Sequence, residues 1–157
     1  MIEETEPGGA ASPRVAVADE QDRPVDTDAL VSFAERALDL AGIPPTHALS
    51  IGLVDRATIA DLKGRYYGER RVTDVLSFPM DGLDVPGPAS LGDVVICVAV
   101  AERHARGLGL PLRRELEVLV VHGILHLAGH DHAVPEDEIA MAREEQRVLA
   151  GALAEAS

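Results

Sequence analysis

The stretch DVVICVAV, residues 93–100, is the part of the sequence that decides the fold. After its first residue it is continuously apolar and rich in β-branched side chains, which is typical of a strand covered on both faces. We therefore expect a buried central strand over the whole of 93–100, with the other elements arranged around it.

Three shorter segments on its N-terminal side have the pattern of further strands. Segments 14–19 and 48–54 alternate between apolar residues and small or polar residues, as half-buried strands do. A third segment, TDVLSFP at 73–79, is closed by a proline. RYYGERR at 65–71 and the stretch 80–92, which is rich in glycine and proline, are predicted to be loops.

Helical periodicity fills the intervals between the predicted strands. Apolar residues recur every three or four positions, and capping residues or prolines stand near the expected helix starts. The first three predicted helices begin at Asp26 or Thr27, at Asp55 and at about Ala101. A fourth helix has Pro111 in its first turn, and the last helix begins at Pro135. Strands interleaved with helices predict the α+β class: a single domain in which a mixed sheet of about four strands packs with several helices.

The composition is that of one globular domain. The chain has 157 residues, and 46 % of them are hydrophobic, which is enough to bury a core. Residues 1–13 are predicted to form a disordered acidic tail ahead of a domain over 14–157. The sequence shows no signal-peptide pattern and no apolar run of about 20 residues, so we expect a cytoplasmic protein without membrane contact. Its single cysteine, Cys97, lies in an apolar run, which favours a buried strand residue over a metal ligand.

The charge of the chain argues against a general electrostatic grip on nucleic acid. There are 27 acidic and 14 basic residues, for a net charge of −13, whereas binding to phosphates depends on Lys and Arg. A local basic cluster is nevertheless present, formed by Lys63, Arg65, Arg70 and Arg71. The cluster is either a solvated surface or an RNA contact.

Four of the six histidines fall in HGILHLAGHDH, residues 122–132. His122 and His126 are four positions apart in the long predicted helix, so both imidazoles project from one face about one turn apart. Gly129 can adopt the left-handed conformation that ends a helix, which lets the chain return and bring His132 to the same ion. Three neutral nitrogen ligands with a water molecule describe a catalytic zinc site, and we predict one Zn²⁺ per chain.

Other polar residues near the motif leave alternatives open. His130 is a rival to His132 as the third ligand, although the helix end at the preceding glycine favours His132. Asp131 is a candidate to hold a ligand imidazole from behind, or else a solvated turn residue. His47 and His104 have no partners at ligand spacing and are expected at the surface.

The glycine that follows the first histidine separates this motif from a peptidase site. The spacing matches the metzincin template H-E-x-x-H-x-x-G-x-x-H at every position but one, where Gly123 replaces the glutamate that acts as general base. A glycine inside a helix costs roughly 1 kcal/mol relative to alanine. We therefore expect another segment of the chain to approach closely beside Gly123.

The histidine motif and two strand motifs together resemble those of the YbeY family of bacterial endoribonucleases, also called rRNA maturation factors. HGILHLAGHDH is similar to the family signature H-G-x-L-H-L-x-G-H-D-H, and TDVLSFP is similar to T-D/N-V-L-S-F-P. LGDVVIC at 91–97 resembles the family's L-G-D-I-x-I-C/S strand. The resemblance runs from about Asp55 to about Leu149, with order and spacing in agreement.

The resemblance implies a zinc-dependent hydrolase that cuts single-stranded RNA during late ribosome maturation. The implied tasks are 3′-end processing of 16S rRNA and ribosome quality control. The implied fold has one four-stranded sheet with the metal in a cleft, and the implied ligands are His122, His126 and His132. The implied partners are rRNA and the small ribosomal subunit, with ribosomal proteins and assembly GTPases as further candidates.

The chain departs from the family pattern at one position. Tyr67 stands where many members carry an arginine, and a tyrosine, neutral at pH 7, cannot replace an arginine beside a phosphate. Arg65 and Arg70 flank this position and are both candidate catalytic residues, while Lys63 and Arg71 are candidate RNA contacts. Two alternative functions stay open: a non-catalytic ribosome assembly factor with a structural zinc, and a metzincin-like zinc peptidase. The sequence does not decide whether water or the ribose 2′-OH attacks the phosphate.

Overall fold

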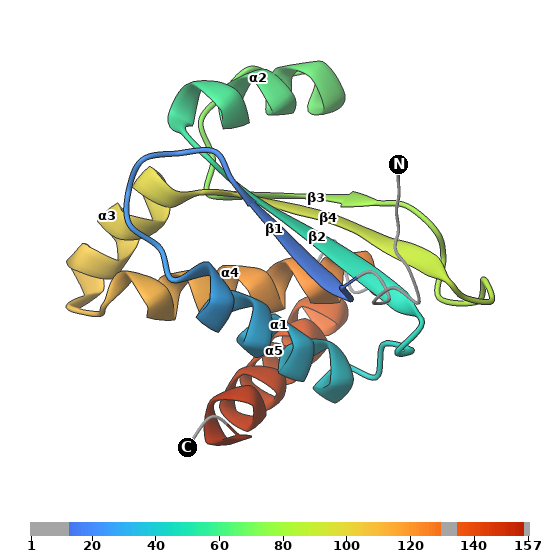
Figure 1. Ribbon diagram of the computed structural model, residues 1–157. Helices are drawn as coiled ribbons and strands as arrows, with labels where there is room; N and C mark the ends of the chain where they lie inside the picture. Colours follow the sequence, from blue (N-terminus) through green and yellow to red (C-terminus); the bar gives the residue numbers. More distant parts are fainter. Residues whose placement is uncertain (1–12, 130–134, 156–157) are drawn as a thin grey trace, which may run out of the picture.

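Four strands and five helices make up the described part of the chain, residues 13–129 and 135–155, in a computed structural model (Figure 1). In chain order the elements are β1 (Val15–Asp19), α1 (Thr27–Leu40), β2 (His47–Val54), α2 (Arg56–Tyr67), β3 (Val75–Pro79), β4 (Ala89–Cys97), α3 (Val98–Leu108), α4 (Leu112–Leu127) and α5 (Pro135–Glu155). The predicted tail falls outside the described residues except for Pro13. No described helix is long and apolar enough to cross a membrane.

The strands form one mixed sheet with the order β1-β2-β4-β3. β1, β2 and β4 run parallel, and β3 pairs antiparallel with β4 as an edge strand. Pro79 ends β3, and a proline fits an edge strand because it has no N–H to donate to a neighbour. The predicted class, a single α+β domain with a four-stranded mixed sheet, is confirmed.

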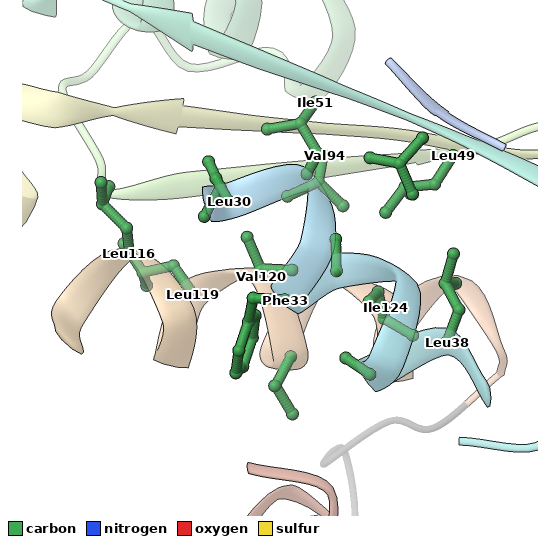
Figure 2. Close-up of a cluster of buried hydrophobic side chains, with 14 of the residues drawn as sticks. Leu30, Phe33, Leu38, Leu49, Ile51, Val94, Leu116, Leu119, Val120 and Ile124 are labelled. Carbon is green, nitrogen blue, oxygen red and sulfur yellow. The ribbon is translucent and has the colours of Figure 1, made fainter. Parts of the chain in front are cut away.

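The two faces of the sheet are covered unequally. α1 and α4 pack on one face with α5 behind them, and α2 lies on the other face (Figure 1). Figure 2 shows how side chains of α1 and α4 meet those of β2 and β4 in the main core; the labelled residues are Leu30, Phe33, Leu38, Leu49, Ile51, Val94, Leu116, Leu119, Val120 and Ile124. Burying each large aliphatic side chain contributes about 1.5–3 kcal/mol. The cluster under α2 is much smaller and is built from Val54, Ile59, Leu76, Cys97 and Ala99.

Gly123 allows α4 to lie close to the centre of the sheet. A Cβ atom at this position would lie 2.6 Å and 2.7 Å from the two γ-methyl groups of Val94 on β4. A side chain there would have to displace the strand or the helix. The close approach expected from the sequence is confirmed, and the segment that approaches is β4.

Local signals set several helix ends as expected. The Asp26 side chain caps α1 by accepting a hydrogen bond from the Ala29 amide, 3.0 Å away. Gly129 follows α4 with a φ of +98°, a left-handed conformation that glycine adopts without strain. Pro111 is the residue before α4 rather than part of its first turn, and α5 begins at Pro135 as predicted.

The predicted loop at 65–71 is wrong in its first part. Arg65, Tyr66 and Tyr67 form the last turn of α2, and Gly68 ends the helix with a φ of +83°. The glycine is the stop signal, because Gly68 itself adopts the left-handed conformation that ends a helix. This extension carries both tyrosines along the helix to the edge of the sheet.

The predicted strand over 93–100 is wrong at both ends. β4 begins at Ala89 and ends at Cys97, and Val98 starts α3. A continuous apolar run does not distinguish a buried strand from a buried helix. Val98 is fully buried as the first residue of a helix. Cys97 itself is a buried strand residue, as expected.

The prediction of a surface position holds for His104 and is wrong for His47. His104 is exposed, whereas His47 is 1 % exposed at the start of β2. Its Nε2 atom lies 3.1 Å from the carbonyl oxygen of Gly82, so the loop after β3 covers it. A contact across 35 residues leaves no trace in local spacing.

Candidate functional site

A cleft of about 520 Å³ runs along the outer edge of β3. α4 forms one wall and the C-terminal turns of α2 form the other, so the cleft is bounded by helices from the two faces of the sheet. The lining residues are Lys63, Tyr67, Val75, Leu76, Ser77, Pro79, His122, His126 and Leu127. The cleft expected at the histidine-bearing helix is therefore present.

His122 and His126 meet in this cleft. They stand one turn apart on α4, and their Nε2 atoms are 3.0 Å apart. The two rings lie edge to face, with centroids 4.5 Å apart. α4 is anchored below them by buried side chains such as Leu119 and Ile124. The packing of the helix therefore holds the pair in position.

Glu145 of α5 contacts the far side of His122. Its Oε2 atom is 2.9 Å from Nδ1 of His122, and both side chains are partly exposed. An ionised carboxylate can only accept a hydrogen bond, so Nδ1 carries the proton and donates it. In the neutral ring this leaves the lone pair on Nε2, which faces His126. Sequence reasoning missed Glu145 because it lies 23 positions away on another helix.

The remaining predicted metal-site residues, His130, Asp131 and His132, lie outside the described residues. Within residues 13–129 and 135–155, no three His, Cys, Asp or Glu side chains form a group that could hold a metal. The described part of the site is therefore the pair His122 and His126 with Glu145 behind it.

The four basic residues of the cluster are placed differently. Lys63 lines the cleft, with Nζ 5.6 Å from the centre of the Tyr67 ring. Arg70 is turned to Asp61, with Nε and Oδ1 2.8 Å apart, and Arg71 lies 3.8 Å from Glu69. Arg65 lies over the Tyr66 ring, 6.0 Å from its centre. Of these four, Lys63 is the one that lines the cleft beside the histidines.

Tyr67 forms part of the cleft wall. Its hydroxyl donates a hydrogen bond to the backbone carbonyl of Ser77, 2.7 Å away on β3. Its ring lies 5.9 Å from the Phe78 ring. The tyrosine thus links the end of α2 to the edge strand β3.

The fold and the cleft together describe an α+β protein in which two histidines of one helix lie beside the edge strand of a mixed sheet. The family model for endoribonuclease YbeY matches residues 16–152. The chain belongs to the YbeY family.

Individual relatives agree with this assignment. The chain is 45 % identical to the endoribonuclease YbeY of Corynebacterium kroppenstedtii over 135 residues, covering 80 % of this chain and 67 % of the relative. It is 43 % identical to that of Thermobifida fusca over 143 residues, covering 87 % and 92 %. The solution structure of TM1509 from Thermotoga maritima superposes with a TM-score of 0.64 at 26 % identity, covering 90 % of each chain. The similarity therefore extends well beyond the three motifs.

Proposed function

We propose that this protein is an endoribonuclease that hydrolyses phosphodiester bonds of single-stranded RNA. The observation that carries the proposal is the pair His122 and His126, with Nε2 atoms 3.0 Å apart in a cleft that Lys63 also lines. The two imidazoles and the ammonium group of Lys63 lie in one cleft, and this set of groups suits an anionic substrate. The endoribonuclease name of the relatives supports the same reaction.

We propose that the cleft holds one zinc ion, bound by His122, His126 and His132. Two nitrogen ligands of a tetrahedral zinc lie about 3.3 Å apart, and the observed separation of 3.0 Å is close to this value. A bound zinc supplies an acidic water and polarises a phosphoryl oxygen. The hydrogen bond that His122 Nδ1 donates to Glu145 supports the fit, because it directs the lone pair of His122 Nε2 into the site.

The other residues of the cleft would bind the substrate and exclude a competing reaction. Lys63 would pair with a backbone phosphate and stabilise negative charge beside the scissile bond. Gly123 faces Val94 in the sheet, and the 2.6 Å approach leaves no space for a glutamate. This packing favours a nuclease over a peptidase that needs a carboxylate at the same place.

In the cell we propose a role in ribosome maturation in the cytoplasm. The substrate would be rRNA on the small ribosomal subunit, cut near the 3′ end of 16S rRNA, with a second task in ribosome quality control. Ribosomal proteins and assembly GTPases are the candidate protein partners. Membership of the YbeY family supports this setting.

The test is cleavage of a labelled single-stranded RNA by the purified full-length chain. We expect cleavage that stops when a chelator removes the metal and returns on addition of zinc. A duplex RNA of the same sequence should be cut much more slowly. Metal-independent cleavage, or none with a zinc-loaded protein, would overturn the proposal.

A cellular experiment separates the nuclease from an assembly factor with a structural zinc. The gene would be expressed in a strain that lacks its own family member, and the 3′ ends of 16S rRNA would be mapped. We expect the wild type to restore mature ends and a folded His126→Ala variant to fail. Full restoration by a His126→Ala variant shown to lack metal would favour the assembly factor.

A further inference from the structure

Two exposed tyrosines stand at the end of α2, beside the histidine cleft. The side chains of Tyr66 and Tyr67 are 59 % and 53 % exposed, and Tyr67 lines the cleft that also contains His122 and His126. Large aromatic side chains contribute most to stability when buried, so two adjacent exposed rings beside a reactive site point to a binding role.

Phe78 of β3 supports both rings. The Tyr66 ring lies 5.3 Å from the Phe78 ring in an edge-to-face arrangement, and the Tyr67 ring lies 5.9 Å away. The hydroxyl of Tyr67 is held by the Ser77 carbonyl. The two tyrosines, here called the tyrosine platform, are therefore held in place against the edge strand.

Cationic groups accompany both tyrosines. Lys63 Nζ lies 5.6 Å from the centre of the Tyr67 ring, and the guanidinium carbon of Arg65 lies 6.0 Å from the centre of the Tyr66 ring. Aromatic faces next to cations are the combination that binds single-stranded nucleic acid, since bases stack on the rings and phosphates pair with the cations. An apolar peptide segment would not use the cations.

We propose that the tyrosine platform is a stacking subsite for bases of the single-stranded RNA next to the cleaved phosphate. The proposal deepens the proposed function and rests on it. Tyr67 stacks a base through its ring, because its hydroxyl already donates to Ser77. Lys63 pairs with a backbone phosphate of that nucleotide. Stacking on rings is tolerant of sequence, so the subsite selects single strands rather than a particular base.

The composition of the chain provides a direct probe of the platform. Its two tyrosines are Tyr66 and Tyr67, and it has no tryptophan. Intrinsic tyrosine fluorescence therefore reports on the platform alone. The probe ligand is a short single-stranded 2′-O-methyl RNA, with an otherwise identical oligonucleotide in which the bases are replaced by abasic residues. Titrations use the full-length zinc-loaded protein, and a gel confirms that the oligonucleotide is intact.

We expect the base-bearing oligonucleotide to quench the tyrosine emission and the abasic one to leave it nearly unchanged. Tyr67→Ala should weaken binding, measured by anisotropy of a labelled oligonucleotide, by roughly 5- to 150-fold, the loss of one stacked base. Tyr67→Phe keeps the ring and should bind within about twofold of wild type. Leu108→Ala, at an exposed apolar position that does not line the cleft, is the matched control and should have no effect.

Several outcomes would overturn the proposal. Equal binding of the abasic oligonucleotide, or unchanged affinity in a Tyr67→Ala variant with a native circular dichroism spectrum, would exclude stacking. If an unstructured apolar peptide changes the tyrosine emission and RNA does not, the platform would be assigned to a protein partner. If the wild type cleaves RNA while the tyrosine variants bind normally, only the subsite fails. If the wild type neither binds nor cleaves RNA, the proposed function fails.

Discussion

The two walls of the cleft differ in how firmly the fold holds them. α4 is buried along most of its length, between the sheet and α5, and it carries the histidine pair. α2 is 12 residues long and has two buried residues, Ile59 and Ala60, of which Ile59 belongs to the small cluster on the other face. The residues that we propose to hold a metal ion are on the densely packed wall. Those that we propose to contact RNA are on the lightly packed one.

This difference is physically reasonable for an enzyme that acts on a flexible polymer. Groups that hold an ion must keep their spacing to within a fraction of an ångström. A surface that binds a single strand gains from small adjustments, and segments with few buried contacts open at lower free-energy cost. Matched changes on the two walls should therefore have different effects.

The largest difference should appear in RNA cleavage. His126→Ala removes a proposed metal ligand from the α4 wall, and we expect a loss greater than the roughly 100-fold caused by losing an outer partner of a ligand. Lys63→Ala removes one phosphate contact from the α2 wall and should cost about tenfold or less. Initial rates on one labelled RNA measure both. Equal losses would contradict the division of roles.

The second prediction concerns Glu145, which supports the α4 wall from behind. Glu145→Ala removes the acceptor for Nδ1 of His122 and should weaken zinc binding by about 10- to 100-fold. Competition with a chromophoric chelator measures the affinity without any RNA. Glu144→Ala, at the neighbouring position that pairs with Arg147, is the control and should leave zinc affinity unchanged. The same affinity in the Glu145 variant would show that the contact has no positioning role.

The third prediction compares two helix glycines, one on each wall, that face neighbouring segments. Gly123→Ala places a methyl group 2.6 Å from Val94, and overpacking of about 1–3 kcal/mol should outweigh the roughly 1 kcal/mol gained in helix propensity. At Gly64 of α2 the nearest atoms are the Cβ and Cα of Arg70, at 3.1 Å and 3.2 Å. These tight contacts should offset most of the roughly 1 kcal/mol gained in helix propensity, so Gly64→Ala should change the free energy of unfolding by at most about 0.5 kcal/mol.

Urea unfolding of the two glycine variants gives the comparison. A Gly123→Ala, Val94→Ala double variant should recover part of the Gly123 penalty, because the second change removes the two clashing methyl groups. A Gly123→Ala protein that is more stable than wild type would show that the approach of α4 to β4 is not tight.

The smallest effect is expected at the start of α2. The pKa of Asp55 is lowered below its usual 3.8 because its carboxylate accepts a hydrogen bond from the Thr58 amide. A depressed pKa means that the carboxylate stabilises the fold above about pH 4, and that this contribution is lost as the pH falls through the folded-state value. Asp55→Asn should show a small deficit at pH 7 that disappears at acid pH. A deficit that grows on acidification would reverse the sign.

Much of the fold could be predicted because its signals are local. Alternation marked β2, and Asp26 marked the start of α1. The errors have two causes, an ambiguous local pattern and a contact that lies far away in the sequence. Val98 was assigned to a strand because apolar runs are ambiguous. His47 was expected at the surface because the loop that covers it begins more than 30 residues later.

The site divides in the same way. His122 and His126 could be paired from spacing alone, since a helix places residues four apart on one face. Glu145 could not be found, because its contact depends on how α5 packs against α4. The place of Lys63 in the cleft could not be found either, because it depends on how α2 packs against the edge strand.

The central claim is that His122 and His126 hold a zinc ion on the densely packed wall. The most direct test is anomalous diffraction at the zinc absorption edge, from crystals of the zinc-loaded full-length protein. We predict a single anomalous peak about 2.0–2.1 Å from Nε2 of both histidines. A peak elsewhere on the chain, or an empty cleft in protein shown to contain zinc, would contradict the account.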